Sequence, residues 1–186
     1  MPADMSAEVP LRGNLRRSDK IMSQDELQAL LAAAYCGRTA TVGADGFPYV
    51  VPNLFVWMDG RIYLHTAKQD GHFLANVGFC ERVCFEVDAP GEIFPYGPIE
   101  CDTSVTYRSA VVFGHISIVA ERDAKLRFFA AFMAKYAPPD SWGRPKGSFP
   151  RVDATIVYAI APQIMTGKQN VLPAAGQRWQ PVNPRR

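Results

Sequence analysis

The sequence predicts a mainly β protein, a small closed or nearly closed antiparallel barrel with peripheral helices. Strand-like runs rich in β-branched and aromatic residues recur along the chain, and short turns built on Asp-Gly join several of them. Strands and helices do not alternate as they do in parallel sheets, and no segment repeats. We expect about six strands and three helices in one domain, because 186 residues suffice to bury a core.

Composition and charge narrow the range of functions. The formal net charge is +2 and basic residues are interleaved with acidic ones, so we expect no nucleic-acid partner. No secretory signal is evident, and the longest apolar stretch, 110–120, is too short to span a bilayer. We therefore expect a cytoplasmic protein with no membrane partner and with reduced cysteines. Cys80 and Cys84 have no second pair to complete a zinc site, so we expect no metal.

The chain divides into an arm, a domain and a tail. Residues 1–22 are expected to pack poorly, 23–170 to form the domain, and 171–186 to be extended. The domain begins with a helix, because Ser23 and Glu26 form a capping box. Apolar side chains follow at helical spacing and predict one buried stripe before Gly37, made of Leu27, Leu30, Leu31 and Ala34.

An antiparallel meander should come next. It consists of strands over 38–42, over 47–58 and from Arg61 onward, joined by Asp-Gly turns at 45–46 and 59–60. The run 47–58 is apolar on both faces, which predicts burial on both sides. Pro48 and Pro52 interrupt its ladder because proline has no N–H to donate. They imply a sheet edge, a bulge or backbone exposed to a ligand.

The stretch 61–76 gathers the most chemistry. Where its short strand ends and helical turns begin near Gly71, it places two of the three histidines, a hydroxyl and a lysine, namely His65, His72, Thr66 and Lys68. A helix start offers free N–H groups and the positive end of a dipole, which favours an anion, phosphate above all. Asp70 offers an alternative, because its own carboxylate could satisfy those donors.

The second half of the chain predicts two further strands and a long loop. A strand over 82–87 is followed by a loop over 89–102, which is rich in proline and glycine. A loop of that length is often functional. A long strand over 104–120 follows, and Gly114 should bend it or form a bulge. A closing strand is expected over 153–165.

The last predicted helix is capped by Asp123. Its buried stripe should consist of Leu126, Phe129, Ala130 and Met133. Phe128 and Phe132 lie beside that stripe and are too apolar for open solvent, so we interpret them as a second contact, such as one to a partner subunit. Trp142, in the loop that follows, is a candidate lid over a site.

Four motifs occur in a characteristic order. They are Asp45-Gly46-Phe47-Pro48 with Pro52 following, Tyr63-Leu64-His65-Thr66 with Gly71 following, Tyr107-Arg108-Ser109-Ala110-Val111-Val112-Phe113-Gly114, and Thr166-Gly167-Lys168. The ordered set resembles the FMN-binding split-barrel family, which includes pyridoxamine-phosphate oxidase, and within it the nitroimidazole-resistance (Nim-type) proteins. The resemblance extends from about Arg16 to Asn170.

The resemblance implies an antiparallel split barrel that forms a homodimer, with FMN at the subunit interface. The cofactor contacts it implies are Val51, Pro52, Asn53, His65, Thr66, Ala67, Lys68, Gly71, His72, Tyr107, Arg108 and Ser109. In this reading Lys68 counters the charge of the phosphate. Lys168 is by default a solvated lysine, and the alternative is a flavin or phosphate contact.

The resemblance also implies a function. We expect a flavin-dependent reductase in which NAD(P)H reduces FMN and FMN then reduces a small acceptor such as a nitroaromatic compound. His65 is the candidate catalytic residue, as a proton donor to the acceptor or a hydrogen-bond donor that orients it. The basic residues that bind substrate phosphate in pyridoxamine-phosphate oxidases have no counterpart here. Alternatives are a non-catalytic flavin- or heme-binding protein, or a dimeric interaction module, and heme or a deazaflavin could replace FMN.

Overall fold

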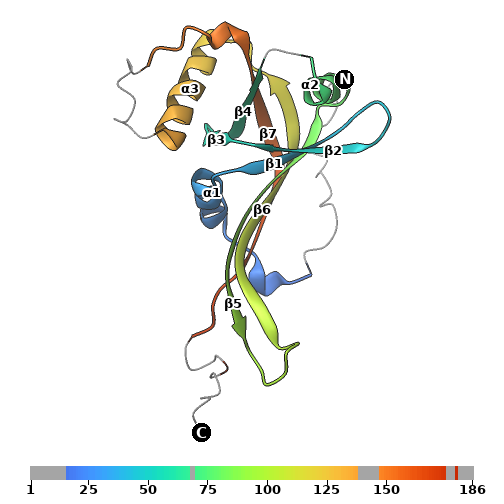
Figure 1. Ribbon diagram of the computed structural model, residues 1–186, viewed down its shortest axis with the longest axis vertical. Helices are drawn as coiled ribbons and strands as arrows, with labels where there is room; N and C mark the ends of the chain where they lie inside the picture. The colour runs from blue at the N-terminus through green and yellow to red at the C-terminus, as the bar shows by residue number, and fades with distance from the viewer. Residues whose placement is uncertain (1–15, 68–69, 138–146, 175–178, 180–186) are drawn as a thin grey trace, which may run out of the picture.

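The computed structural model describes residues 16–67, 70–137, 147–174 and 179. Within them, seven antiparallel strands form one sheet in the order β2-β1-β5-β6-β7-β4-β3 (Figure 1). The strands are β1 Gly37–Val42, β2 Pro48–Asn53, β3 Phe55–Met58, β4 Arg61–Ala67, β5 Arg82–Pro95, β6 Thr103–Ile118 and β7 Thr155–Asn170. The helices are α1 Gln24–Ala33, α2 His72–Phe79 and α3 Arg122–Tyr136, with short 3-10 turns at Ser18–Lys20 and Val152–Ala154. The prediction of an antiparallel sheet with peripheral helices is confirmed.

The sheet closes on itself through a single residue. β2 and β3 lie at its opposite edges, yet only Leu54 separates them in the chain. The predicted single strand 47–58 is therefore wrong, because it is two edge strands that meet where the sheet curls round. Burial on both sides is also wrong for β2, since alternate residues from Pro48 to Pro52 are exposed. Of the explanations for the two prolines, the sheet edge is confirmed.

Both Asp-Gly turns form as predicted. Gly46 has a φ of 78°, and Asp59 and Gly60 have φ values of 53° and 69°. Two successive residues with positive φ make the type of turn that matches the twist of a hairpin. These local signals therefore determine how β1 meets β2 and how β3 meets β4.

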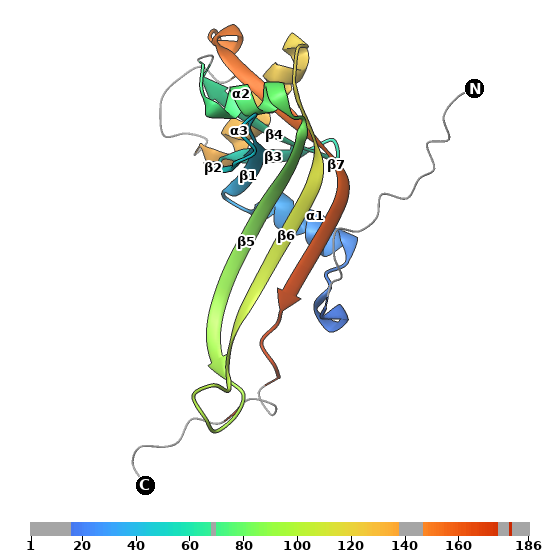
Figure 2. The ribbon, with the colours of Figure 1, turned by 90° about the vertical axis from the view of Figure 1, so that its right-hand side faces the viewer.

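The first half of the predicted loop 89–102 is strand. β5 continues to Pro95 and pairs with β6 along its length. Together with the end of β7, these two strands project from the rest of the sheet, and we call this projection the blade (Figure 2). The strand accommodates Pro90 and Gly91 because the register of β5 against β6 shifts between Pro90 and Ile93. Gly91 packs so closely on Thr106 that a Cβ would collide with its hydroxyl. The proline and glycine content thus marks a bulge within a strand.

Gly114 marks a second irregularity, which confirms the predicted bend or bulge. The register of β6 against β7 shifts between Phe113 and Gly114. A Cβ at position 114 would meet the carbonyl oxygen of Ala161, so only glycine allows the strands to approach this closely. β7 also runs on to Asn170, five residues beyond the predicted end.

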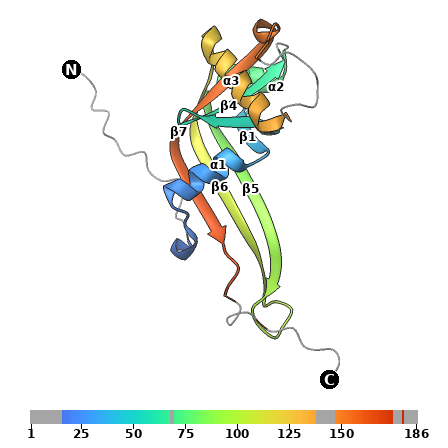
Figure 3. The same cartoon turned by 90° about the vertical axis from the view of Figure 1, so that its left-hand side faces the viewer.

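The main core fills the inside of the curled sheet. α1 lies across the strands (Figure 3), and Leu27, Leu30 and Leu31 from its buried stripe enter this core. The capping box is confirmed, because the Ser23 and Glu26 side chains each bond the backbone N–H of the other residue. The segment before the helix also docks on the sheet, since Met22 is buried and its N–H donates to Gly167 O.

α3 packs through a different face from the one predicted. Phe128 is fully buried, in a second core cluster with residues of β4 and β7. Ala130 and Met133, assigned to the buried stripe, are exposed, and the cap residue is Glu121, not Asp123. Phe128 does make a second contact, but with β4 and β7 of its own chain and not with a partner subunit, and Phe129 of the predicted stripe is partly buried against the same cluster. Two apolar faces compete on this helix, and the position of β4 and β7 decides between them.

Candidate functional site

His65 lies on β4 beneath the aromatic side chains of α3. Its ring centroid is 5.0 Å from that of Phe132, 5.7 Å from Phe128 and 5.8 Å from Phe129. The Nδ1 atom is buried and makes no hydrogen bond among the described residues. Burial lowers the pKa of His65, because the apolar rings do not solvate its charged form. The surroundings therefore favour the neutral imidazole, and its buried Nδ1 has no polar partner among the described residues.

Thr66 is the next residue of β4 but faces the opposite side. Its hydroxyl lies 3.2 Å from the hydroxyl of Tyr158, which belongs to the main core and stacks edge-on against Phe73 of α2. Successive strand residues point to opposite faces, so His65 and Thr66 cannot contact one small group from the same side. Sequence reasoning missed Tyr158, because no local pattern distinguishes it from an ordinary strand tyrosine.

The start of α2 is open. Its cap residue is Gly71 and no side chain among the described residues bonds its first N–H groups, so Asp70 does not cap the helix. His72, in the first turn, is exposed and stacks edge-on against Tyr49 of β2 at 5.6 Å. Lys68 lies outside the described residues, so its contact with a phosphate stays a prediction. The open helix start is the feature of this region that suits an anion.

The cofactor contacts that the resemblance implies on β2 are Val51, Pro52 and Asn53, and β2 borders this region through Tyr49. Val51 is partly buried against the main core, Pro52 is exposed, and Asn53 accepts a 2.7 Å hydrogen bond from the Thr39 hydroxyl. The structure thus brings residues 51–53, the end of β4 and the start of α2 to one end of the molecule.

The remaining predicted contacts lie on the blade. Tyr107, Arg108 and Ser109 belong to β6, and Ser109 pairs directly with Lys168 of β7. Tyr107 and the exposed Arg108 line a groove of about 370 Å³ beside the bulge of β5. On β7, Ile156 pairs with Thr66 and Lys168 pairs with Ser109. These two positions are twelve residues apart on β7, about 40 Å along the curved strand. Across the sheet the path is shorter, because Pro52 pairs with Arg38, and Arg38 bonds Asp88, the partner of Ser109 on β5.

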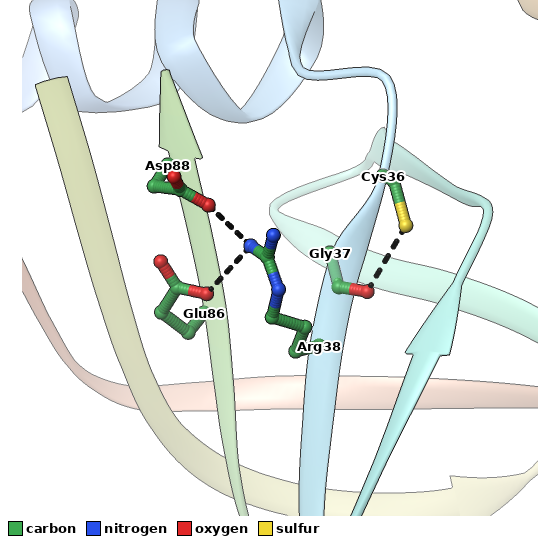
Figure 4. Close-up of polar contacts among 5 residues, drawn as sticks. All are labelled: Cys36, Gly37, Arg38, Glu86 and Asp88. Atoms are coloured by element: carbon green, nitrogen blue, oxygen red, sulfur yellow. Dashed lines mark hydrogen bonds and ion pairs between the residues drawn. The ribbon is translucent and has the colours of Figure 1, made fainter. Parts of the chain in front are cut away.

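An ion cluster that the sequence analysis missed lies on the partly exposed surface of β1 and β5, next to β2. Figure 4 shows Arg38 of β1 between two carboxylates of β5; its Nη1 donates to Glu86 at 3.0 Å and to Asp88. Both carboxylates raise the pKa of Arg38. The partners are about fifty positions away in sequence, so only the pairing of β1 with β5 brings them together. The side chain of Arg38 is about half exposed, so each bond contributes little to stability.

A search against protein families gives one match over most of the chain. The model for pyridoxamine 5'-phosphate oxidase matches residues 23–169. The chain belongs to this family. The predicted resemblance to pyridoxamine 5'-phosphate oxidases is confirmed, and the matched residues include both groups of predicted site residues. No curated protein sequence matches the chain.

Solved structures confirm the split-barrel fold of this pyridoxamine 5'-phosphate oxidase family member. A putative 5-nitroimidazole antibiotic resistance protein from Bacteroides thetaiotaomicron matches with a TM-score of 0.67 at 21% identity, over 80% of this chain and 86% of that one. The flavocytochrome Anf3 from Azotobacter vinelandii matches with 0.70 at 16%, over 92% and 86%. An FAD and heme binding protein from Mycobacterium smegmatis matches with 0.68 at 22%, over 87% and 77%.

Among the residues that the structure describes, no helix has the length and apolar character needed to cross a membrane. The same residues contain no group of three or more His, Cys, Asp or Glu side chains placed to hold a metal ion.

Proposed function

We propose that this chain is a flavin-dependent oxidoreductase that binds FMN and reduces a small organic acceptor, such as a nitroaromatic compound, with electrons from NAD(P)H. The observation that carries the proposal is the start of α2 on a fold of this family. The first N–H groups of α2 are bonded by no described side chain, and with His72 in the first turn and Lys68 just before it in sequence they suit the phosphate of a flavin. Relatives of the same fold are named for FAD or as flavocytochromes. When bound, the flavin would take hydride from NAD(P)H and pass electrons to the acceptor.

The two separated groups of candidate residues support a site shared between two copies of the chain. Along β7, about 40 Å of curved strand lies between the positions that pair with Thr66 and Ser109, which favours a site that a second copy completes. If the blade of a second copy crosses the first, its Tyr107, Arg108 and Ser109 can approach the start of α2. Exposed apolar side chains on the blade, among them Ile93 and Val105, are consistent with such a contact.

His65 is our candidate for the catalytic residue. Its lowered pKa keeps the imidazole neutral at neutral pH, so it offers one N–H donor and one acceptor nitrogen. Phe128, Phe129 and Phe132 cover part of the ring and exclude water from it. In this arrangement the neutral His65 donates a hydrogen bond that orients the acceptor.

The visible spectrum of the purified protein tests the proposal. We expect a flavin spectrum, extraction of FMN by mass, and bleaching when NADPH is added without oxygen, followed by recovery of colour when a nitroaromatic acceptor is added. A colourless protein that takes up no flavin would contradict the proposal. A flavin that NADPH and NADH both fail to reduce would contradict the enzymatic part of it.

A second candidate is a non-catalytic flavin- or heme-binding protein. The observation in its favour is the buried Nδ1 of His65, an imidazole nitrogen that has no hydrogen-bond partner among the described residues. Two of the matched structures are named as a flavocytochrome and as an FAD and heme binding protein. A Soret band after addition of heme, lost in His65→Ala, would favour this candidate.

A further inference from the structure

The first residue of β3 has an unusual set of backbone partners. Phe55 pairs with Leu64 of β4, and β3 is an edge strand with no strand on its other side. The N–H of Phe55 donates to the Tyr136 hydroxyl at 3.1 Å, and its carbonyl oxygen lies 2.8 Å from the same hydroxyl. Both groups therefore point away from β4, where an edge strand normally leaves them to water. The end of α3 replaces the missing strand.

Tyr136 also joins two parts of the chain that only the fold brings together. Its hydroxyl lies 2.8 Å from the carbonyl oxygen of Tyr35, in the link between α1 and β1, and shares its one proton between that oxygen and the carbonyl of Phe55. Tyr35 lies two residues before Gly37, which pairs with Asn53 at the end of β2. The hydroxyl thus connects the two sides of the seam across which Leu54 closes the barrel.

Lys135 strengthens the same connection. Its Nζ donates to the carbonyl oxygen of Phe55 at 3.1 Å and lies 4.1 Å from the centroid of the Phe55 ring. The salt bridges found among the described residues do not include it. Burial lowers its pKa to about 8, so a partly desolvated amine is held at this carbonyl without a carboxylate. Removal of the Lys135 amine from water costs free energy, and the hydrogen bond to the Phe55 carbonyl oxygen offsets this cost.

We propose that Lys135 and Tyr136 are positioning residues that fix the backbone from Val51 to Phe55, and with it the edge of the flavin site. Only the part of this inference that concerns the flavin site rests on the proposed function. Residues 51–53 contact the flavin in our proposal, and they precede Phe55 with only Leu54 between them. We call the hydrogen bonds of Lys135 and Tyr136 to Phe55 the clamp. Without the clamp this segment should move more freely, and flavin binding must then include the entropic cost of ordering it.

Amide exchange and flavin binding in matched variants test the inference. Tyr136→Phe and Lys135→Met remove the two clamping groups, and Lys135→Arg keeps a donor at this position. Tyr35→Phe and Lys125→Met are the controls: the first removes a hydroxyl from the same cluster without touching the Tyr35 carbonyl, and the second removes a lysine from the same helix. All are measured well below the midpoint of thermal unfolding, with circular dichroism to establish that each is folded.

In Tyr136→Phe and Lys135→Met we expect faster exchange of the amides of residues 51 and 53–55 and about tenfold weaker FMN binding, the size of one hydrogen bond. Lys135→Arg should restore much of both, and the controls should match the wild type. Unchanged exchange over 51–55, or unchanged FMN affinity in a wild type that binds FMN, would overturn the inference. If the wild type takes up no FMN, the proposed function fails, and the exchange result alone decides whether the clamp exists.

Discussion

The imidazole of His65 stands at right angles to the ring of Phe132, with centroids 5.0 Å apart. This contact joins β4 to α3, so the candidate catalytic side chain is held by the same helix that clamps Phe55. Its protonation state and the packing of α3 are therefore coupled.

The stability of the protein should fall in mild acid because of this histidine. Burial lowers the pKa of His65 in the folded chain, while in the unfolded chain it stays near ~6.5. As the pH falls through that value, the unfolded state binds more protons than the folded state, so the free energy of unfolding decreases. Urea unfolding at neutral pH and at lower pH values measures this. His65→Phe should lose this part of the pH dependence, and an identical dependence in that variant would contradict the prediction.

His65→Ala should leave FMN bound but slow the reduction of the acceptor. The substitution removes the hydrogen-bond donor, while the open start of α2 is on another element and remains intact. Stopped-flow measurements separate reduction by NADPH from reoxidation by a nitroaromatic compound, and we expect the loss in the second step. His115→Ala, on β6, is the matched control and should retain the rate. Turnover at the wild-type rate in His65→Ala would remove the residue from the mechanism.

Mixed dimers should show whether the site is shared. Lys68→Ala and Arg108→Ala, each alone, should weaken FMN retention, because Lys68 shortly precedes α2 in sequence and Arg108 lies on the blade. If each site takes its two groups from different chains, a mixed dimer has one site with both defects and one with neither. Random mixing of the two variants should then restore about a quarter of the wild-type sites. No recovery on mixing would mean that both groups belong to one chain's site.

Phe128→Ala should destabilise the fold far more than Met133→Ala on the same helix. Phe128 is fully buried in the second core cluster, whereas Met133 is 37% exposed. Removal of a buried phenylalanine typically costs about 3–5 kcal/mol, and we expect less than about 1 kcal/mol for the exposed methionine. Urea unfolding measures both. Equal losses would show that α3 packs through the face that its sequence pattern suggested.

Much of the candidate site could be named from the sequence, but its arrangement could not. The motifs placed His65, Thr66 and Gly71 in one short stretch, and the structure places them at the end of β4 and the start of α2. The motifs could not show that His65 and Thr66 face opposite sides, or that about 40 Å of curved strand lies between the β7 positions that pair with Thr66 and Ser109. Those facts depend on strand register.

The sequence by itself determined the features that depend on near neighbours: the Ser23–Glu26 capping box, the two Asp-Gly turns and the bulge at Gly114. Only the tertiary structure decided which face of α3 is buried, that β5 continues through Pro90, and that Tyr136 closes the seam at Phe55. The physical reason is range. A cap or a tight turn is stabilised by atoms a few residues away, whereas a buried face, a strand partner or a seam is chosen by residues far along the chain whose positions exist only once the sheet has formed.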